Sequence, residues 1–143
     1  MFKDTKFMSA EDKEILLKQW ERFIKNGMRQ EHFTDRIYKH LTLHCSFIAH
    51  YSRRGFYSVY FENPENTIRF LEQFNPKGGH KSVEYGADWW YTDPDYHDIN
   101  EAMCQVVGKY IDKYRKAKKE EAKLRDILQA KRLLERHGIP LNL

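Results

Sequence analysis

The fold is decided by residues 98–137, which read DINEAMCQVVGKYIDKYRKAKKEEAKLRDILQAKRLLERH. Helix-forming residues run almost without interruption through this stretch, and its apolar residues recur at the three- and four-residue steps of an α-helix. One unbroken helix of this length would extend roughly 60 Å, whereas a compact domain of this chain length has a radius of gyration of only about 14–15 Å. The helix therefore either breaks and folds back or projects and meets a partner, and the sequence leaves both options open.

The same stretch divides into three parts by residue type. Residues 99–114 carry a wide apolar face, which predicts packing into the domain. Residues 115–123 offer only two alanines among charged side chains, a pattern typical of a solvent-bridging helix. Residues 124–137 regain an apolar face that needs a cover, either a second copy or the chain's own surface, because an isolated helix with exposed leucines is neither stable nor soluble. We favour a homodimer, with an interface formed by Leu124, Ile127, Leu128 and Leu134.

The N-terminal two thirds of the chain also favour helices. Ser9 and Asp12 match the pattern of a helix N-cap, and residues 31–53 carry an apolar stripe at helical spacing. The aromatic run at 56–61 repeats at a four-residue step, which favours a helix over a strand.

A further helix and a long loop complete the expected fold. Asn63-Pro64 is a strong helix start, because asparagine caps and proline fits the first helical position. No periodicity survives from 75 to about 97, and loops of such length are often functional. We therefore predict an all-α fold, a four- to five-helix bundle with this loop and a long, partly projecting C-terminal helix.

The length and composition are typical of one globular domain. The 143 residues are 41% hydrophobic, which is enough for a core. No apolar run approaches the ~20 residues of a membrane span, so we expect no membrane contact. Two cysteines, expected as buried thiols, are too few for a disulfide framework, which favours a cytoplasmic protein. The expected parts are a flexible N-terminal arm (1–8), a helical domain (9–114) and a basic helical extension (115–143).

The positive charge is concentrated in the last helix. The chain has a formal charge of +4, but residues 109–136 hold eleven Lys or Arg against five Asp or Glu, a net of +6. Clustered cations on one element are typical of contact with an acidic partner, for example nucleic acid. The alternative is a solvated helix stabilised by ion pairs such as Asp112–Lys116 and Glu121–Arg125. The predicted contact residues are Arg53, Arg54, Arg115, Lys116, Lys118, Lys119 and Lys123.

Aromatic residues gather in the middle of the chain. Thirteen of the 21 Phe, Tyr and Trp lie between Phe47 and Tyr96. They form part of the core, a protein interface, or a surface on which bases or a ligand stack. The sequence leaves these three interpretations open.

The rival interpretation of function centres on the loop at 75–98. Aromatic and acidic side chains there could form a ligand pocket, and an enzyme would be one version of it. His40 and His44 lie one turn apart, a spacing that allows a shared metal, but no motif supplies further ligands, so we predict neither metal nor cofactor. No motif places a base beside a nucleophile. The pocket residues under this alternative are His44, His80, Trp89, Trp90 and His97.

Taken together, the patterns favour a non-enzymatic interaction or regulatory module. It would be homodimeric, and its basic helix and aromatic patch would contact an acidic partner, either an acidic protein or nucleic acid. A small-molecule or metal-binding protein that uses the loop is the alternative.

Overall fold

The computed structural model describes residues 2–44, 52–72 and 94–140 of the chain. These residues form five α-helices and a short 3-10 helix and contain no strand, so the predicted all-α class is confirmed. Most of the predicted loop at 75–97 lies outside the described residues. The chain divides into two compact units, Met1–Ile111 and Asp112–Leu143.

Helix α1 (Ala10–Lys25) begins as the capping pattern predicts. The Ser9 hydroxyl accepts a hydrogen bond from the Asp12 amide at 3.1 Å, which satisfies one of the free amides of the first turn. The helix ends at Lys25, and two residues later Gly27 has a φ of 89°, a left-handed conformation that glycine adopts without strain. The chain reversal is closed by the Met28 amide, which donates to the Phe23 carbonyl at 2.8 Å.

The stripe at 31–53 does not form a single helix. Residues Gln30–His32 form the 3-10 helix η1, and helix α2 (Asp35–His44) begins only after Thr34. The Thr34 hydroxyl accepts from the Ile37 amide at 3.2 Å, so it acts as the cap that fixes the start of α2. The predicted start at residue 31 was therefore wrong, because this threonine was not recognised as a cap.

Arg53, expected at the end of that helix, instead begins helix α3 (Arg53–Tyr60). The Ser52 hydroxyl caps α3 by accepting from the Gly55 amide at 3.1 Å. The intervening residues 45–51 lie outside the described residues. Helix α3 confirms that the aromatic run at 56–61 is largely helical.

Helix α4 (Pro64–Glu72) starts as predicted. The Asn63 side-chain oxygen accepts from the amides of Glu65 and Asn66 at 3.0 and 3.3 Å. Proline at the first position has no amide that would need a partner there. Helix α4 packs against α3.

An aromatic cluster forms the centre of unit Met1–Ile111. Phe33 stacks on Phe56 with ring centroids 5.6 Å apart, and Phe70 meets Phe56 edge-on at 5.7 Å. Phe61 contacts Phe23 of α1 edge-on at 4.9 Å. All five side chains are buried. Phe56, Phe61 and Phe70, which belong to the aromatic group in the middle of the chain, therefore form core, one of the three interpretations that the sequence left open.

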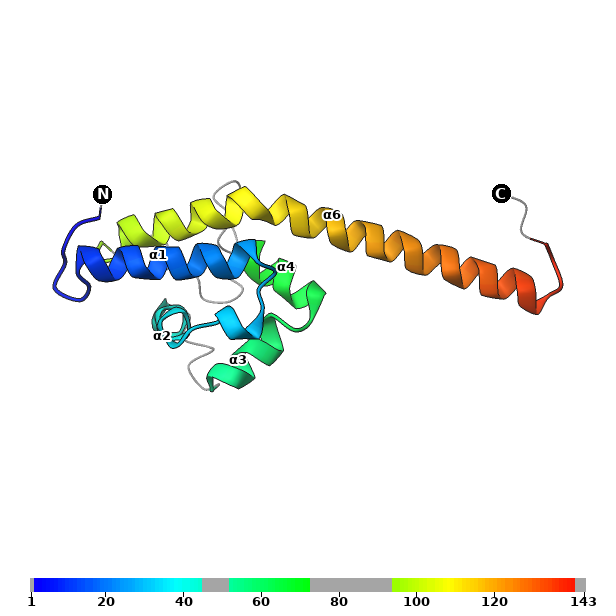
Figure 1. Ribbon diagram of the computed structural model, residues 1–143, viewed down its shortest axis with the longest axis horizontal. Helices are drawn as coiled ribbons and strands as arrows, with labels where there is room; N and C mark the ends of the chain where they lie inside the picture. The colour runs from blue at the N-terminus through cyan, green and yellow to red at the C-terminus, as the bar shows by residue number, and fades with distance from the viewer. Residues whose placement is uncertain (1, 45–51, 73–93, 141–143) are drawn as a thin grey trace. The chain divides into compact units, whose positions relative to one another are not determined.

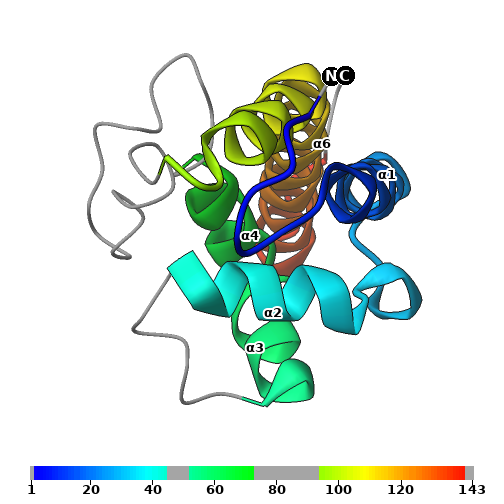
Figure 2. The ribbon, with the colours of Figure 1, turned by 90° about the vertical axis from the view of Figure 1, so that its left-hand side faces the viewer.

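Helix α6 (His97–Arg136) is a single helix of 40 residues, or roughly 60 Å. The helix is continuous over these residues. Its first part contributes Ile99, Met103 and Val107 to the core. The indole of Trp20 donates to the Met103 carbonyl at 3.0 Å and so fixes α1 beside this part of α6, while α2 crosses α1 (Figures 1 and 2).

The far end of α6 has a defined stop. Gly138 takes a φ of 68°, and the Ile139 amide donates to the Leu134 carbonyl at 2.8 Å. This is the same type of glycine-based ending that terminates α1, and it is where the sequence predicts it.

Candidate functional site

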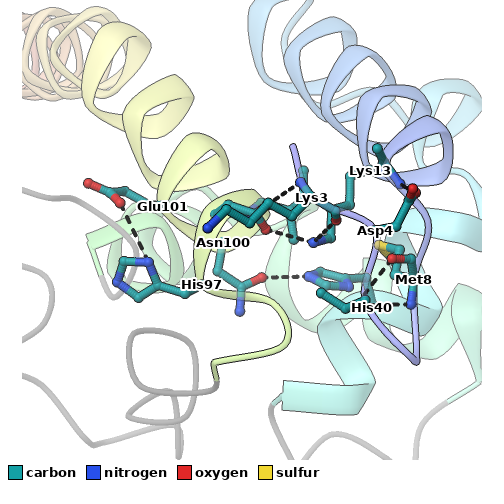
Figure 3. Close-up of polar contacts among 12 residues, drawn as sticks. Lys3, Asp4, Met8, Lys13, His40, His97, Asn100 and Glu101 are labelled. Carbon is teal, nitrogen blue, oxygen red and sulfur yellow. Dashed lines mark hydrogen bonds and ion pairs between the residues drawn. The ribbon is translucent and has the colours of Figure 1, made fainter. Parts of the chain in front are cut away.

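A buried ion pair joins α1, α6 and the N-terminal arm (Figure 3). The Lys13 side chain is 0% exposed, and its ammonium lies 2.9 Å from the Asp98 carboxylate. The same ammonium donates to the Lys3 carbonyl at 2.7 Å, and the Lys3 amide donates back to Asp98 at 2.9 Å. Because a buried ammonium without partners would be very costly, these contacts explain how a lysine is tolerated in the core.

The pKa of Asp98 is lowered from its ordinary value. Burial of the carboxyl acts to raise the pKa, but hydrogen bonds from Lys13, Lys3 and the Ile99 amide, with the charge of Lys13, outweigh it. The group is therefore held ionised and paired. That is the chemistry of a structural contact, since a general acid needs a raised pKa near neutrality.

Residues 1–8 were expected to form a flexible arm. Besides the contacts of Lys3, the Asp4 carboxylate accepts from the Ala10 amide at 2.7 Å and so supports the start of α1. Met1 lies outside the described residues. The flexibility of the arm stays a prediction, but its contacts connect it to the core.

The described histidines do not gather into a site. His40 is 3% exposed and donates through Nε2 to the side-chain oxygen of Asn100 at 2.7 Å. His97 is exposed and lies 3.7 Å from Glu101 (Figure 3). Within residues 2–44, 52–72 and 94–140, no three His, Cys, Asp or Glu side chains are placed to share a metal ion.

The remaining pocket residues of the rival interpretation fall outside what the structure describes. The side chain of His44 and the residues His80, Trp89 and Trp90 belong to this group. The loop-centred pocket therefore stays a prediction.

Arg53 and Arg54 line a hollow of about 480 Å³ at the start of α3. The hollow also includes Glu31 and Asp35, which already bind other cations: Glu31 lies 2.8 Å from Arg29, and Asp35 lies 3.0 Å from a lysine one turn on. Both charge signs therefore meet there, which weakens the attraction for an acidic partner.

The predicted dimer residues are exposed within unit Asp112–Leu143. Leu124 is 61% exposed, Leu128 53% and Ile127 45%, while Leu134 is half-buried. Large apolar side chains are rarely so exposed in series without a binding role.

The expected ion pairs along this part of α6 do not form. Asp112 was expected to pair with Lys116, four residues later. It instead binds Arg115, three residues later, at 3.1 Å. Among the described residues, Glu121 and Arg125 lie beyond the 4.0 Å limit for an ion pair. A helix stabilised by many internal pairs is therefore not what the structure shows.

The exposed part of α6 has two different faces. At about 100° per residue, Leu124, Ile127 and Leu134 fall within an arc of about 80°, here called the apolar face. Roughly 140° around the helix from it lies a second arc, only about 40° wide, that holds four cations. This basic stripe consists of Lys118, Arg125, Arg132 and Arg136.

The basic stripe overlaps little with the predicted contact residues. Only Lys118 belongs to both sets, because Lys116 and Lys123 fall on the side of the apolar face and Lys119 between the two faces. The signal that would have found the stripe is the seven-residue spacing of Lys118, Arg125 and Arg132. Whether any of these cations contacts a partner stays a prediction.

Comparison of the chain with protein-family models, with curated protein sequences and with solved structures finds no match. Among the described helices, none combines the length and the apolar character needed to cross a bilayer.

Proposed function

We propose that this protein is a non-enzymatic interaction module, which pairs with a second copy through the apolar face and contacts an acidic partner through the cations of α6. The observation that carries the proposal is the exposure of Leu124, Ile127 and Leu128 on a helix segment rich in cations. An exposed apolar series favours association, and clustered cations favour an anionic partner. The cytoplasmic location predicted from the cysteines is part of the proposal.

A second copy is the occupant that the apolar face fits best. Placing Leu124 and Lys131 at the a positions of a heptad puts Ile127 and Leu134 at d, and a single lysine at a is a known means of specifying the pairing of two strands. In a parallel pair of this register, Lys116 of one copy lies near Glu121 of the other. This pair favours the register beside the apolar positions, whereas Glu120 falls at the preceding d position and opposes it.

Among the predicted contacts with an acidic partner, those on α6 have more support than Arg53, Arg54 and the aromatic patch. Phe56 is fully buried and Phe61 is 7% exposed, so these parts of the aromatic patch offer little surface to a partner. Arg53 and Arg54 share their hollow with two carboxylates. The cations of the exposed helix are therefore the stronger candidates.

Association is tested by measuring solution mass over a range of concentrations. We expect the wild-type chain to shift from monomer to dimer, and Leu124→Gln/Ile127→Gln to shift the midpoint to at least tenfold higher concentration. The matched control is Leu133→Gln, which replaces an equally exposed leucine (47%) on the opposite side of the helix. A wild-type chain that stays monomeric at all concentrations would contradict the pairing.

Acidic-partner binding is tested at low ionic strength with a DNA duplex, a single strand and polyglutamate as probes. We expect at least one probe to bind with an affinity that falls as salt is added, and Lys118→Glu/Lys119→Glu to abolish the binding. If none binds, the acidic-partner proposal is wrong. Stoichiometric metal in untagged protein would instead support the loop-centred alternative.

A further inference from the structure

We infer that the acidic partner is a nucleic acid duplex and that the basic stripe is the surface that contacts its phosphates. This inference rests on the proposed function and deepens it. The first observation is the regularity of the stripe. Lys118, Arg125 and Arg132 are spaced by seven residues, or about 10.5 Å, and Arg136 follows one turn later.

The second observation is the absence of acids on the stripe. Continuing the three- and four-residue steps through the stripe gives Arg115, Lys118, Ala122, Arg125, Gln129, Arg132 and Arg136. The two gaps between cations are filled by a small and a neutral side chain. Of the five acids of Asp112–Arg136, Glu121 and Asp126 lie about 20° outside the two edges of this row, and the other three lie about 60° or more away. The four cations therefore form a row of about 27 Å that no acid interrupts, with Glu121 beside it.

A duplex fits this row of cations better than an acidic protein does. Double-stranded DNA carries one charge per about 1.7 Å of axis, so a row of cations finds phosphates at any register. A stable protein interface, in contrast, needs apolar or aromatic anchors at its centre. Ala122 and Gln129 supply no such anchor on the stripe.

A single strand and a lipid surface fit less well. Proteins that hold single strands stack bases on exposed aromatic side chains. The aromatic residue on this side of the helix is Tyr114, one turn before Lys118, and it is half-buried with the Lys113 ammonium over its ring. Insertion into a bilayer would bury the apolar face, but Glu120 and Lys131 lie within its arc and Glu135 beside it. Charges so placed are costly in hydrocarbon.

The two faces can be used together. The stripe lies roughly 140° around the helix from the apolar face, so pairing of two copies leaves each stripe on an outer side. One straight duplex then contacts one stripe, with four cations. Binding that depends on phosphates alone should be independent of base sequence.

The test is a salt titration of binding to a duplex of about 30 base pairs, followed by fluorescence anisotropy. Four phosphate contacts give a slope of log K against log salt of about −3.6, so affinity should fall about 150-fold between 50 and 200 mM salt. For Arg125→Gln/Arg132→Gln we expect a slope of about −1.8 and a fall of only about 12-fold. Duplexes of scrambled sequence should give the same slopes.

The matched control is Lys116→Gln/Lys123→Gln, which removes two exposed cations at the same seven-residue spacing from the other side of the helix. We expect its slope to stay within about 0.5 of the wild type. Solution mass of each variant shows whether pairing is retained. An equal or larger loss of slope in the control would overturn the assignment of the stripe, while leaving acidic-partner binding in place.

Further outcomes separate this inference from the proposed function. Binding to polyglutamate without binding to duplex would overturn the inference and retain the proposed function. Tighter binding to phosphatidylserine vesicles or to a single strand than to duplex would likewise overturn the choice of partner. If the wild-type chain binds none of these probes, both the inference and the acidic-partner part of the proposed function are wrong, and pairing is decided by its own test.

Discussion

The two parts of helix α6 differ in what stabilises them. From His97 to Ile111 the helix gives Ile99, Met103 and Val107 to a core, whereas from Asp112 to Arg136 its leucines are largely exposed. Both parts have the same helical backbone, so local propensity does not separate them. The first part is therefore fixed by tertiary contacts, and under the proposed pairing a second copy would stabilise the second part.

The largest effect should come from the anchor of the first part. Trp20→Ala removes a fully buried indole and its hydrogen bond to the Met103 carbonyl. We expect the free energy of unfolding to fall by about 3–5 kcal/mol. Urea denaturation followed by circular dichroism measures this loss, and Leu133→Ala, at an exposed leucine of the second part, serves as the control with a change below about 0.5 kcal/mol.

A smaller effect is expected at the ion pair that ties the start of α6 to α1. Lys13→Met retains the apolar stem but leaves Asp98, which is 30% exposed, without its ammonium. Because Asp98 keeps some contact with water, we expect a loss of about 1–3 kcal/mol. The double variant with Asp98→Asn should lose less than the sum of the single losses. Additive losses would show that the pair contributes no coupling.

The same pair predicts a pH dependence. The pKa of folded Asp98 lies below its ordinary value of 3.8, so between these values the unfolded chain binds more protons and stability rises with pH. The wild-type advantage over Asp98→Asn should be complete above roughly pH 5 and disappear as pH falls through the folded pKa. Unfolding free energies of both proteins across this range test it. An advantage that persists in strong acid would contradict the role of the charge.

The smallest effect is expected from glycine substitutions that compare the two parts of α6 directly. Gln105 and Gln129 are both exposed on α6, one in each part. Glycine at either position weakens a helix by about 1 kcal/mol. For Gln105→Gly we expect that loss in the unfolding of unit Met1–Ile111. Gln129→Gly should reduce helical circular dichroism and leave that unfolding free energy within about 0.3 kcal/mol. Equal losses would mean that the two parts unfold as one.

Much of the fold could be predicted because residues close in sequence determine where its helices begin and end. Ser9, Asn63 and Gly138 each satisfy or end a helix through contacts within a few residues, and the structure has all three where expected. The helix start at Thr34 was not predicted, because the apolar stripe at 31–53 favoured a helix that continues through this threonine. The partnership of Lys13 with Asp98 could not be found, since it joins residues 85 positions apart.

The candidate site was less predictable for a physical reason. Counting cations locates a charged helix but does not say which side of it each charge occupies. Lys116 and Lys118 are close in sequence and yet lie on different faces. The basic stripe appears only when the spacing is taken as seven residues along one regular helix, whose continuity the sequence alone left open.

The buried ammonium of Lys13 also constrains how the protein is made. Its two partners are Lys3, which leaves the ribosome before it, and Asp98, which is synthesised much later. Until Asp98 emerges, α1 can bury its apolar side only by desolvating a cation that lacks its counter-ion. Nascent chains that end before Asp98 should therefore hold the first helix only loosely and leave its apolar side accessible to chaperones. We expect chaperones to dissociate once the ion pair has formed.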